Sequence, residues 1–179
     1  MWSIMTMCVT PMLTQEQIAA RVAELGAQIA ADYAGQKLTV VCILKGSFVF
    51  CADLVRAIDL DLRVDFLAVR SYGEGTESSG VVQIVNDLSK PIENDHVLVV
   101  EDIVDTGLTI AHLIELLQTR HPASIKVCSL LNKPARARVQ VPIDYLGFTI
   151  EDKFVVGYGL DDREFKRNLP FVGVVETVA

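Results

Sequence analysis

The segment spanning residues 97–109 constrains the fold of this chain more than any other. It opens with four apolar residues, which is typical of a strand buried on both faces of a parallel sheet. Glu101 and Asp102 follow directly, and an Asp-Thr-Gly turn then leads into the apolar periodicity of a helix over about residues 108–120. The sequence therefore predicts a strand, a short acidic turn and a helix N-terminus, at the strand end where open α/β sheets bind ligands.

The turn after this predicted strand has the chemistry of a phosphate site. The unpaired N–H groups and partial positive charge of a helix N-terminus attract anions. Gly107 lets the backbone approach a ligand closely, and Thr106 and Thr109 add hydroxyl donors. Because Glu101 and Asp102 would repel a phosphate, we expect them to hold sugar hydroxyls or a divalent cation. A plain strand and turn with a solvated acidic patch is the alternative interpretation.

Length and composition narrow the class of protein. A chain of 179 residues fits one domain, and a net charge of −7 argues against a nucleic-acid surface. The sequence contains neither a Gly-x-Gly-x-x-Gly nor a Walker-type loop, which disfavours dinucleotide and ATP binding. The four cysteines form no Cys-x-x-Cys pair, so we expect buried free thiols in a reducing cytoplasm. No apolar run is long enough to cross a membrane, and we expect the apolar N-terminal stretch to pack on the domain as a strand or arm.

Strands and helices alternate along most of the chain. Thr14 and Gln17 form a predicted capping box for a helix that ends near residues 33–35, and a second helix is predicted over about residues 48–55. Predicted strands occupy residues 38–44, 63–69, 81–85, 97–100, 125–131, 145–150, 154–156 and 171–175. This order indicates an α/β fold with a mainly parallel central sheet flanked by helices.

Further polar residues follow predicted strands. Lys45 can bind a diphosphate while Gly46 lets backbone N–H groups turn inward, although an ordinary turn with a solvent-facing lysine fits equally well. Lys133 can donate to a carbonyl oxygen, although a lone lysine is more often a surface residue. Ser71 and Tyr72 open a polar loop rich in glycine and serine, which suits either a lid that excludes water or simple disorder.

The stretch 154–161 offers the groups that a flat base and a cation require. Phe154 can stack on a base, and Val155 can pair with the base through its backbone. Asp161 can bind a magnesium ion directly or through water. An edge strand followed by a charged turn is the alternative interpretation.

These motifs, in this order, resemble those of the phosphoribosyltransferases. The strand, acidic pair and phosphate loop at residues 97–109 resemble the family's signature, and Leu-Lys-Gly-Ser at residues 44–47 resembles the diphosphate loop of its 6-oxopurine members. The stretch 154–161, with Arg167 six residues after Asp161 as a diphosphate clamp, resembles a second family motif. From about residue 14 to 176, the chain is similar to the bacterial-type hypoxanthine (hypoxanthine-guanine) phosphoribosyltransferases.

The resemblance implies the type I phosphoribosyltransferase fold, with residues 1–179 as one domain. A small hood would be built from the N-terminal arm and roughly residues 150–179. It implies transfer of the phosphoribosyl group of 5-phosphoribosyl 1-diphosphate (PRPP) to hypoxanthine and also guanine, giving IMP or GMP and diphosphate, with Mg²⁺ as cofactor. It further implies a homodimer or homotetramer in the cytoplasm, without a nucleic-acid or membrane partner, and a cis peptide bond between Leu44 and Lys45.

The resemblance also implies a role for each site residue. Asp105 would be the general base that accepts the proton from purine N7. PRPP and its ribose 5-phosphate would contact Glu101, Asp102, Asp105, Thr106, Gly107, Leu108 and Thr109. The diphosphate would contact Lys45, Gly46 and Arg167, the purine would contact Lys133, Phe154, Val155 and Asp161, and magnesium would contact Glu101, Asp102 and Asp161. Ser71 and Tyr72 would form the lid.

Two other classes of function compete with this one. A non-catalytic regulator on the same fold, sensing PRPP and binding nucleic acid, usually has a basic surface or an added DNA-binding domain, whereas this chain is acidic. A flavodoxin-like binding module is disfavoured, since the paired acids would repel a cofactor phosphate. Asp105 also distinguishes the chain from adenine-specific relatives, which usually have a small residue at this place.

Overall fold

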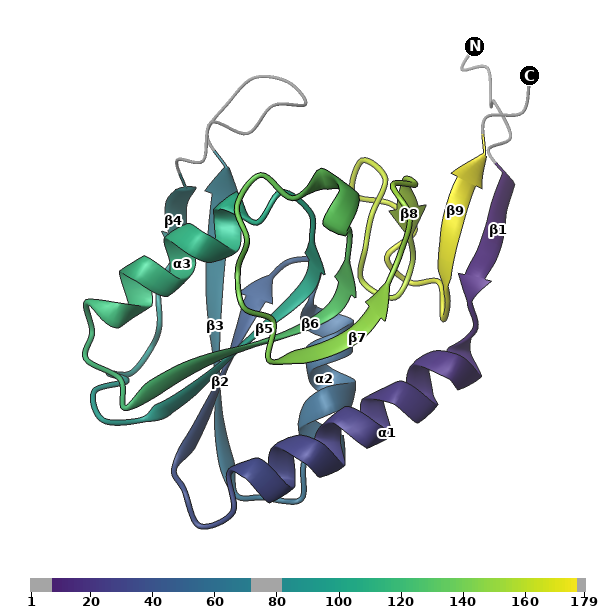
Figure 1. The fold of residues 1–179 in the computed structure, drawn as a ribbon. Helices are drawn as coiled ribbons and strands as arrows, with labels where there is room; N and C mark the ends of the chain where they lie inside the picture. Colours follow the sequence, from purple (N-terminus) through teal and green to yellow (C-terminus); the bar gives the residue numbers. More distant parts are fainter. Residues whose placement is uncertain (1–7, 72–81, 177–179) are drawn as a thin grey trace.

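The computed structural model describes residues 8–71 and 82–176, which form two β-sheets and the helices packed on them (Figure 1). The larger sheet has six strands in the order β4-β3-β2-β5-β6-β7, and every neighbouring pair is parallel except β3 and β4. Its strands are β2 (Leu38–Leu44), β3 (Leu62–Ser71), β4 (Val82–Asn86), β5 (His96–Val104), β6 (Ser124–Asn132) and β7 (Tyr145–Thr149). This topology confirms the predicted α/β fold with a mainly parallel central sheet.

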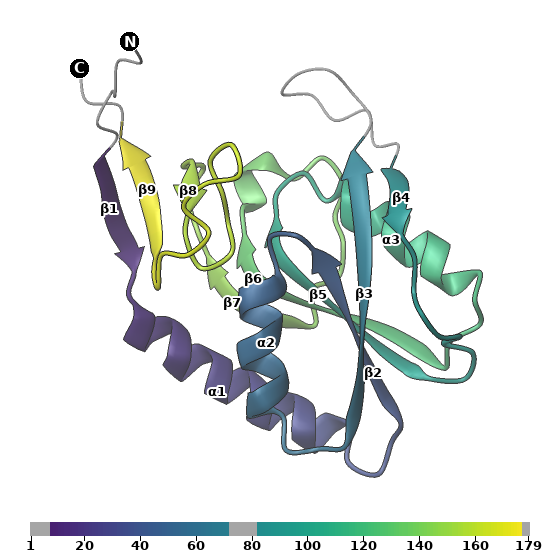
Figure 2. The ribbon, with the colours of Figure 1, turned by 180° about the vertical axis from the view of Figure 1, so that it is seen from behind.

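Helices cover both faces of the larger sheet (Figures 1 and 2). The helices α1 (Gln15–Asp32) and α2 (Phe48–Ala57) pack on one face, and α3 (Leu108–Gln118) packs on the other. Because successive side chains of β2 point to opposite faces of the sheet, the core is divided into two clusters. Val40 and Cys42 belong to the cluster under α1 and α2, whereas Val41 and Ile43 belong to the cluster under α3.

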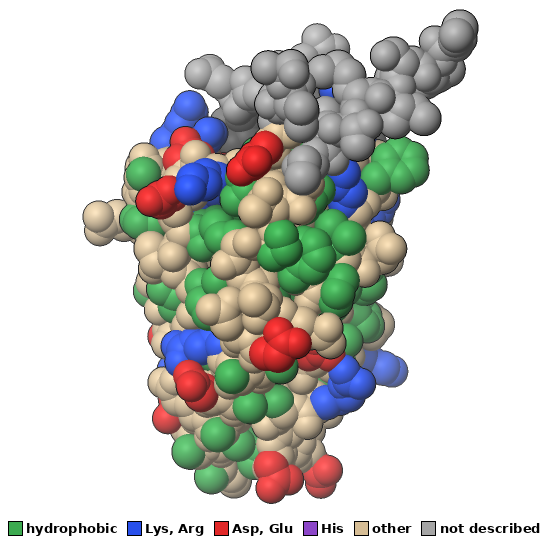
Figure 3. Space-filling model, turned by 90° about the vertical axis from the view of Figure 1, so that its right-hand side faces the viewer, with side chains coloured by type: hydrophobic (Ala, Val, Ile, Leu, Met, Phe, Trp, Pro, Cys, Tyr) green, Lys and Arg blue, Asp and Glu red, His purple; other side chains and the backbone are tan. Residues whose placement is uncertain are grey.

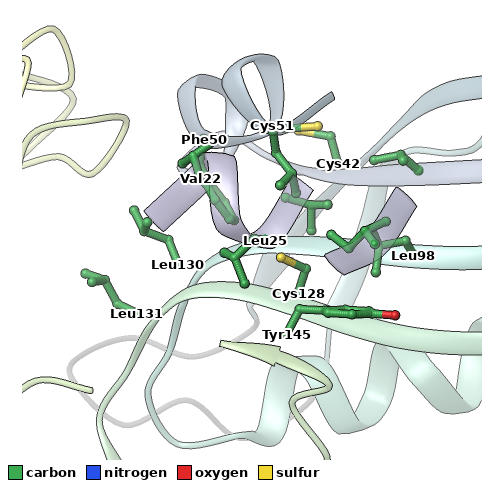
Figure 4. Packing of buried hydrophobic residues seen from close by; sticks show 14 of the residues in the cluster. Val22, Leu25, Cys42, Phe50, Cys51, Leu98, Cys128, Leu130, Leu131 and Tyr145 are labelled. Atoms are coloured by element: carbon green, nitrogen blue, oxygen red, sulfur yellow. The ribbon is translucent and has the colours of Figure 1, made fainter. Parts of the chain in front are cut away.

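The cluster under α1 and α2 is packed from several elements at once. Figure 4 shows Leu25 of α1 beside Phe50 and Cys51 of α2, with Cys128 of β6 and Tyr145 of β7 beneath them. These side chains are all at most 2% exposed. Because burial of large apolar side chains supplies most of the stability of a small domain, this cluster holds the helices on the sheet.

The smaller sheet is an antiparallel hood of three strands in the order β1-β9-β8. It joins β1 (Cys8–Leu13) to β8 (Val155–Val156) and β9 (Val172–Glu176), so the two ends of the described chain lie side by side. Figures 1 and 2 show the hood beside the carboxyl edge of the larger sheet. On the face seen in Figure 3, acidic and basic side chains are interspersed over the described part of the surface.

Most predicted boundaries agree with the structure to within one or two residues. The Thr14–Gln17 capping box is present at the start of α1, with reciprocal hydrogen bonds of 2.8 and 3.3 Å. Cys42, Cys51 and Cys128 are buried and free, as expected. None of the helices among the described residues is long and apolar enough to span a membrane.

One boundary prediction is wrong, and it concerns the central strand. The sequence predicted a strand over residues 97–100 followed by an acidic turn, whereas β5 continues to Val104 and contains both acids. The reason is backbone pairing: Glu101 lies opposite Ser129 and Val104 opposite Asn132, so β6 continues to satisfy the backbone of β5 beyond the apolar run. The turn therefore comprises only the residues between β5 and α3.

A buried carboxylate ties the amino edge of the sheet together, opposite the carboxyl edge. The Asp95 side chain is 1% exposed and forms ion pairs with Lys37 at 2.7 Å and Arg63 at 2.8 Å. It also accepts a hydrogen bond of 2.8 Å from the Thr39 hydroxyl. Burial would raise the pKa of Asp95, but the hydrogen bonds from Lys37 and Thr39 and the charges of Arg63 and Lys37 outweigh it and leave the pKa lowered.

We predict that Asp95→Asn lowers the free energy of unfolding at pH 7 by about 2 kcal/mol, because charge-assisted hydrogen bonds are lost. A carboxyl whose pKa is lowered by folding stabilises the native state above its unfolded pKa of about 3.9 and loses that contribution as pH falls through the folded value. Urea unfolding should therefore show a difference between variant and wild type that is constant from about pH 5 to 7 and shrinks below about pH 4. Glu151→Gln, which removes one partner of an exposed ion pair, is the control. A difference independent of pH would contradict the electrostatic explanation.

Candidate active site

Two adjoining cavities lie at the carboxyl edge of the larger sheet. The larger, of about 620 Å³, lies between the loop after β2, the acidic end of β5 and the loop after β8. The smaller, of about 110 Å³, is formed by the turn between β5 and α3. Glu101 and Thr109 line both cavities, so the two spaces meet at the end of β5. Together they bring together most of the predicted site residues: Lys45, Gly46, Glu101, Asp102, Asp105, Thr106, Gly107, Thr109, Asp161 and Arg167.

The smaller cavity has the features of an anion site. Gly107 caps α3 with φ +80°, and a Cβ at this position would run into the Val139 carbonyl oxygen. The first turn of α3 contains no acidic residue, and no side chain caps the helix through its N-cap residue. A weak hydrogen bond of 3.4 Å joins the Leu108 N–H to the Thr106 hydroxyl. The helix N-terminus thus presents its N–H groups toward the cavity with little competition, which is how proteins commonly bind phosphate.

The two acids differ in their surroundings. Glu101 is 8% exposed, and its Oε2 atom has no hydrogen-bond partner among the described residues. Burial, the charge of Asp102 and the hydrogen bond with that side chain raise the pKa of Glu101 well above its usual value. Asp102 is less buried, and its Oδ1 atom accepts a hydrogen bond of 2.8 Å from the Ile103 N–H. Glu101 therefore lacks a partner that a hydroxyl donor or a cation would provide.

The donor set at the end of β5 fits a magnesium ion. Mg²⁺ is usually bound by one or two carboxylates, with water and substrate oxygens completing its octahedron. Glu101 and Asp102 supply this pair, and the Oε2 atom of Glu101, which has no hydrogen-bond partner among the described residues, is free to coordinate an ion. Among the residues that the structure describes, no group of three or more His, Cys, Asp or Glu side chains could hold a metal ion. Asp161 therefore does not form one group with Glu101 and Asp102.

The turn after β2 lies against the acid pair. The peptide bond between Leu44 and Lys45 is cis, as the resemblance implied. The Ser47 hydroxyl, which is fully buried, donates to the Ile43 carbonyl at 2.5 Å and so fixes the turn. A Cβ at position 46 would overlap the carboxylate of Asp102. Glycine at this position therefore lets the turn approach the acid closely, whereas any other side chain would force the Asp102 carboxylate or the turn to move.

Charges compensate one another on the opposite side of the larger cavity. Arg167 forms an ion pair of 2.9 Å with Asp161 and donates to the Gly159 carbonyl at 2.8 Å. Lys45 forms an ion pair of 2.9 Å with Glu164, which lies 3.5 Å from Arg167 as well. The hydrogen bond from Lys45, together with the lysine charge, lowers the pKa of Glu164. Glu164 is not among the predicted site residues, since an acidic residue in a charged turn gives no sequence signal until the two cations are known to converge on it.

Asp105, Lys133 and the residues of the second motif lie around these cavities. Asp105 Oδ1 is 3.0 Å from Arg136 Nε, and Lys133, although 92% buried, is 3.7 Å from Asp152. Arg136 and Asp152 were not predicted as site residues. Phe154, by contrast, exposes 57% of its surface, which leaves its ring free for stacking.

The remaining predicted site residues lie on α3, on β8 and at the end of β3 or beyond it. Leu108 is the first residue of α3 and is half-buried, and Val155 is a buried residue of β8 that lies opposite Val174 of β9. The predicted lid begins with Ser71, the last residue of β3, whose side chain is not described. Tyr72 lies outside the described residues.

Comparison with known proteins identifies the class. A family model of the phosphoribosyl transferase domain matches residues 10–163, so the chain belongs to the phosphoribosyltransferase family. The chain is 49% identical over 165 residues to the hypoxanthine-guanine phosphoribosyltransferase of Staphylococcus aureus strain Mu50, covering 92% of each chain. It is 48% identical over 171 residues to that of Mycobacterium avium, covering 92% of this chain and 84% of the relative.

Solved structures agree with this assignment. A hypoxanthine phosphoribosyltransferase from S. aureus superposes with a TM-score of 0.90 at 49% identity, over 93% of this chain and 90% of the other. A hypoxanthine-guanine phosphoribosyltransferase from Bacillus anthracis, with a HEPES molecule in its active site, gives 0.89 at 43% identity, over 93% and 98%. The chain thus stands among the hypoxanthine-guanine phosphoribosyltransferases, and the predicted resemblance and fold are confirmed.

The close contact between Gly46 and the Asp102 carboxylate can be tested by substitution. Gly46→Ala should weaken binding of inorganic diphosphate measured by calorimetry with magnesium, because the new Cβ must displace either the turn or the Asp102 carboxylate. Overpacking of this kind costs about 1–3 kcal/mol, and if this cost falls on the bound state it is equivalent to roughly a 5- to 150-fold loss of affinity. Gly35→Ala, with open space around its Cβ and a φ of +73°, should lower stability but leave diphosphate binding unchanged. Unchanged affinity in Gly46→Ala would show that the close approach is unimportant for binding.

Proposed function

We propose that this chain transfers the 5-phosphoribosyl group of PRPP to the 6-oxopurines hypoxanthine and guanine, giving IMP or GMP and diphosphate in purine salvage. The observation that carries the proposal is the junction of a helix-N-terminal anion cavity with a larger cavity at Glu101 and Thr109. A sugar phosphate spans such a junction, with its phosphate in the smaller space and its sugar and leaving group in the larger. The relatives with this name, at 48–49% identity, support the same assignment.

In this proposal, each part of PRPP has its own set of contacts. The 5′-phosphate lies at residues 105–109, against the N–H groups of α3. Glu101 and Asp102 bind the 2′ and 3′ hydroxyls of the ribose. The diphosphate contacts Lys45 and Arg167, which both line the larger cavity and both face Glu164. Bound Mg²⁺, held by Glu101 and Asp102 with Asp161 for a second ion, would neutralise charge on the diphosphate.

The chain's own residues supply the rest of the reaction. As the bond from C1′ to the diphosphate oxygen breaks, positive charge develops on the ribose, and the carboxylates at the end of β5 stabilise it. The purine forms the N9–C1′ bond, and its N7 proton passes to Asp105. The Asp105 side chain is 39% exposed although its Oδ1 atom is buried against Arg136, so Oδ2 is the oxygen that can take this proton.

The purine lies between the sheet edge and the hood. Lys133 donates to the 6-oxo group, the exposed ring of Phe154 stacks on the base, and the Val155 backbone pairs with its edge. Ser71 and Tyr72 close the site against water, which would otherwise capture the cationic sugar. We propose that residues 1–179 act as one catalytic domain, with a hood from the N-terminal arm and roughly residues 150–179, in a cytoplasmic homodimer or homotetramer.

A steady-state assay with PRPP and magnesium, offering hypoxanthine, guanine, xanthine and adenine in parallel, tests the proposal. Turnover of hypoxanthine or guanine without adenine is the expected result. PRPP binding without turnover of any base would instead support a non-catalytic PRPP sensor.

Asp105→Asn should lower kcat for hypoxanthine by roughly 10²-fold or more, the contribution of a general base, while the affinity for PRPP changes little. The amide preserves the size of the side chain but cannot take the proton. Asp61→Asn, at an exposed position just before β3, is the matched control and should retain full activity. A near-wild-type kcat in Asp105→Asn would show that another group accepts the proton.

Lys133→Ala should raise the KM for hypoxanthine by roughly 10- to 100-fold, since a hydrogen bond from a charged donor to the 6-oxo group is lost. The KM for PRPP should stay within about twofold of wild type, because PRPP has no contact with this lysine. Lys90→Ala, an exposed lysine after β4, serves as the control. Equal losses for both substrates would indicate that Lys133 has a structural role.

A further inference from the structure

The segment after β6 is fastened to the phosphate loop by its backbone. It contains a short 3-10 helix, Pro134–Arg136, and follows directly on Lys133. The Lys133 N–H donates to the Val104 carbonyl at 2.9 Å, so the segment begins beside the end of β5. The Thr106 carbonyl accepts hydrogen bonds from the N–H groups of Arg138 at 2.9 Å and Val139 at 3.1 Å. These bonds fix where the side chains of the segment can reach.

Four charged side chains of alternating sign form a row across this junction. Arg136 Nε lies 3.0 Å from Asp105 Oδ1, and Arg136 Nη1 lies 3.7 Å from Asp152 Oδ2. The other oxygen of Asp152, Oδ1, lies 3.7 Å from Lys133 Nζ. Asp152 therefore bridges the two cations with separate oxygens, and Arg136 bridges the two carboxylates. The row connects the proposed general base at one end to the proposed 6-oxo-binding lysine at the other.

The contact between Arg136 and Asp105 leaves the base free to react. Although the Nε and Oδ1 atoms are at ion-pair distance, Oδ1 is buried and accepts no aligned hydrogen bond among the described residues. Because the Asp105 side chain is 39% exposed while Oδ1 is buried, the guanidinium attracts the carboxylate through Oδ1 and leaves Oδ2 to take a proton. A fully aligned two-point clamp would hold the carboxylate equally well but would compete with the substrate.

We infer that Arg136 and Asp152 are positioning residues that set the spacing between Asp105 and Lys133, so that the pair reads one edge of a 6-oxopurine. This inference rests on the proposed function. The 6-oxo oxygen and N7 lie on the same edge of the base. An N7–H proton needs an acceptor there, which is Asp105, and the oxo oxygen needs a donor, which is Lys133. A 6-aminopurine places a donor opposite the lysine ammonium and is rejected, because two donors face each other.

Arg136 and Asp152 are needed because Asp105 and Lys133 are not held together by a shared element. Asp105 and Lys133 belong to different strand ends, and Asp152 lies in the loop after β7. Without the row, Lys133 is a nearly buried cation whose ammonium loses its counter-charge, and Asp105 is free to rotate away from the base. Arg136 and Asp152 therefore act through the two residues that touch the purine and do not touch it themselves.

A double-mutant cycle tests the inference with the full-length enzyme, magnesium, PRPP and hypoxanthine. Arg136→Gln should lower kcat by roughly 10- to 30-fold in the wild-type background, with the KM for PRPP unchanged. In the Asp105→Asn background the same substitution should lower kcat by less than about twofold, because its effect passes through the Asp105 carboxylate. Arg136→Lys, which keeps the charge, should recover part of the loss.

A second cycle applies to the other half of the row. Asp152→Asn should raise the KM for hypoxanthine by roughly 5- to 10-fold in the wild type and by less than about twofold in the Lys133→Ala background. Lys153→Gln removes a charge from the neighbouring exposed pair with Glu151 and should leave all kinetic constants unchanged. Thermal unfolding of each variant identifies any loss of folded protein.

The outcomes separate the two proposals. If the wild type turns over hypoxanthine but Arg136→Gln costs the same factor in both backgrounds, or costs nothing, Arg136 does not act through Asp105 and the inference is overturned. If the wild type turns over no purine, the proposed function fails and this inference fails with it. If non-additivity appears in both cycles, the row positions the base and the lysine as inferred.

Discussion

The site depends on a single constraint, which is that β5 must be buried on both faces of the sheet. Val97 to Val100 contribute to the clusters under α3 and under α1 and α2 in turn, so this strand has no face open to water. Polar side chains are costly along such a strand and become favourable only near its end. Since neighbouring strands run parallel, their ends coincide, and the turn after β2, the acids of β5 and Lys133 after β6 reach the same edge.

That edge concentrates opposing charges in a small volume. Glu101 is buried beside Asp102, and its pKa is raised because burial and the neighbouring charge both oppose ionisation. Lys45 and Arg167 supply positive charge in the same cavity, and Arg136 supplies it beside Asp105; each cation is already matched to a carboxylate. Backbone contacts set the distances: the Gly46 turn abuts Asp102, and the segment after β6 is tied to the Thr106 carbonyl.

Sequence reasoning predicted the fold class, most strand limits and the residues of the contiguous motifs, since apolar periodicity and turn chemistry are local properties. It placed the end of β5 too early because Glu101 and Asp102 end the apolar run, whereas pairing with β6 continues to Val104. It also missed Glu164, Arg136 and Asp152. Each of these has a partner in a distant segment, so no pattern within its own neighbourhood could show that the side chains converge.

The carboxylate of Glu164 lies where two cations meet, and this placement affects which anions the site admits. Lys45 and Arg167 are attractive to any phosphate, yet both already face an internal negative charge. A singly charged anion gains little by replacing a carboxylate that is covalently tethered beside them. A ligand with several charges and its own metal would gain more attraction from the two cations than is lost when their contacts with Glu164 are broken. Under the proposed function, the loop after β8 would therefore favour a multiply charged substrate over the small anions of the cell.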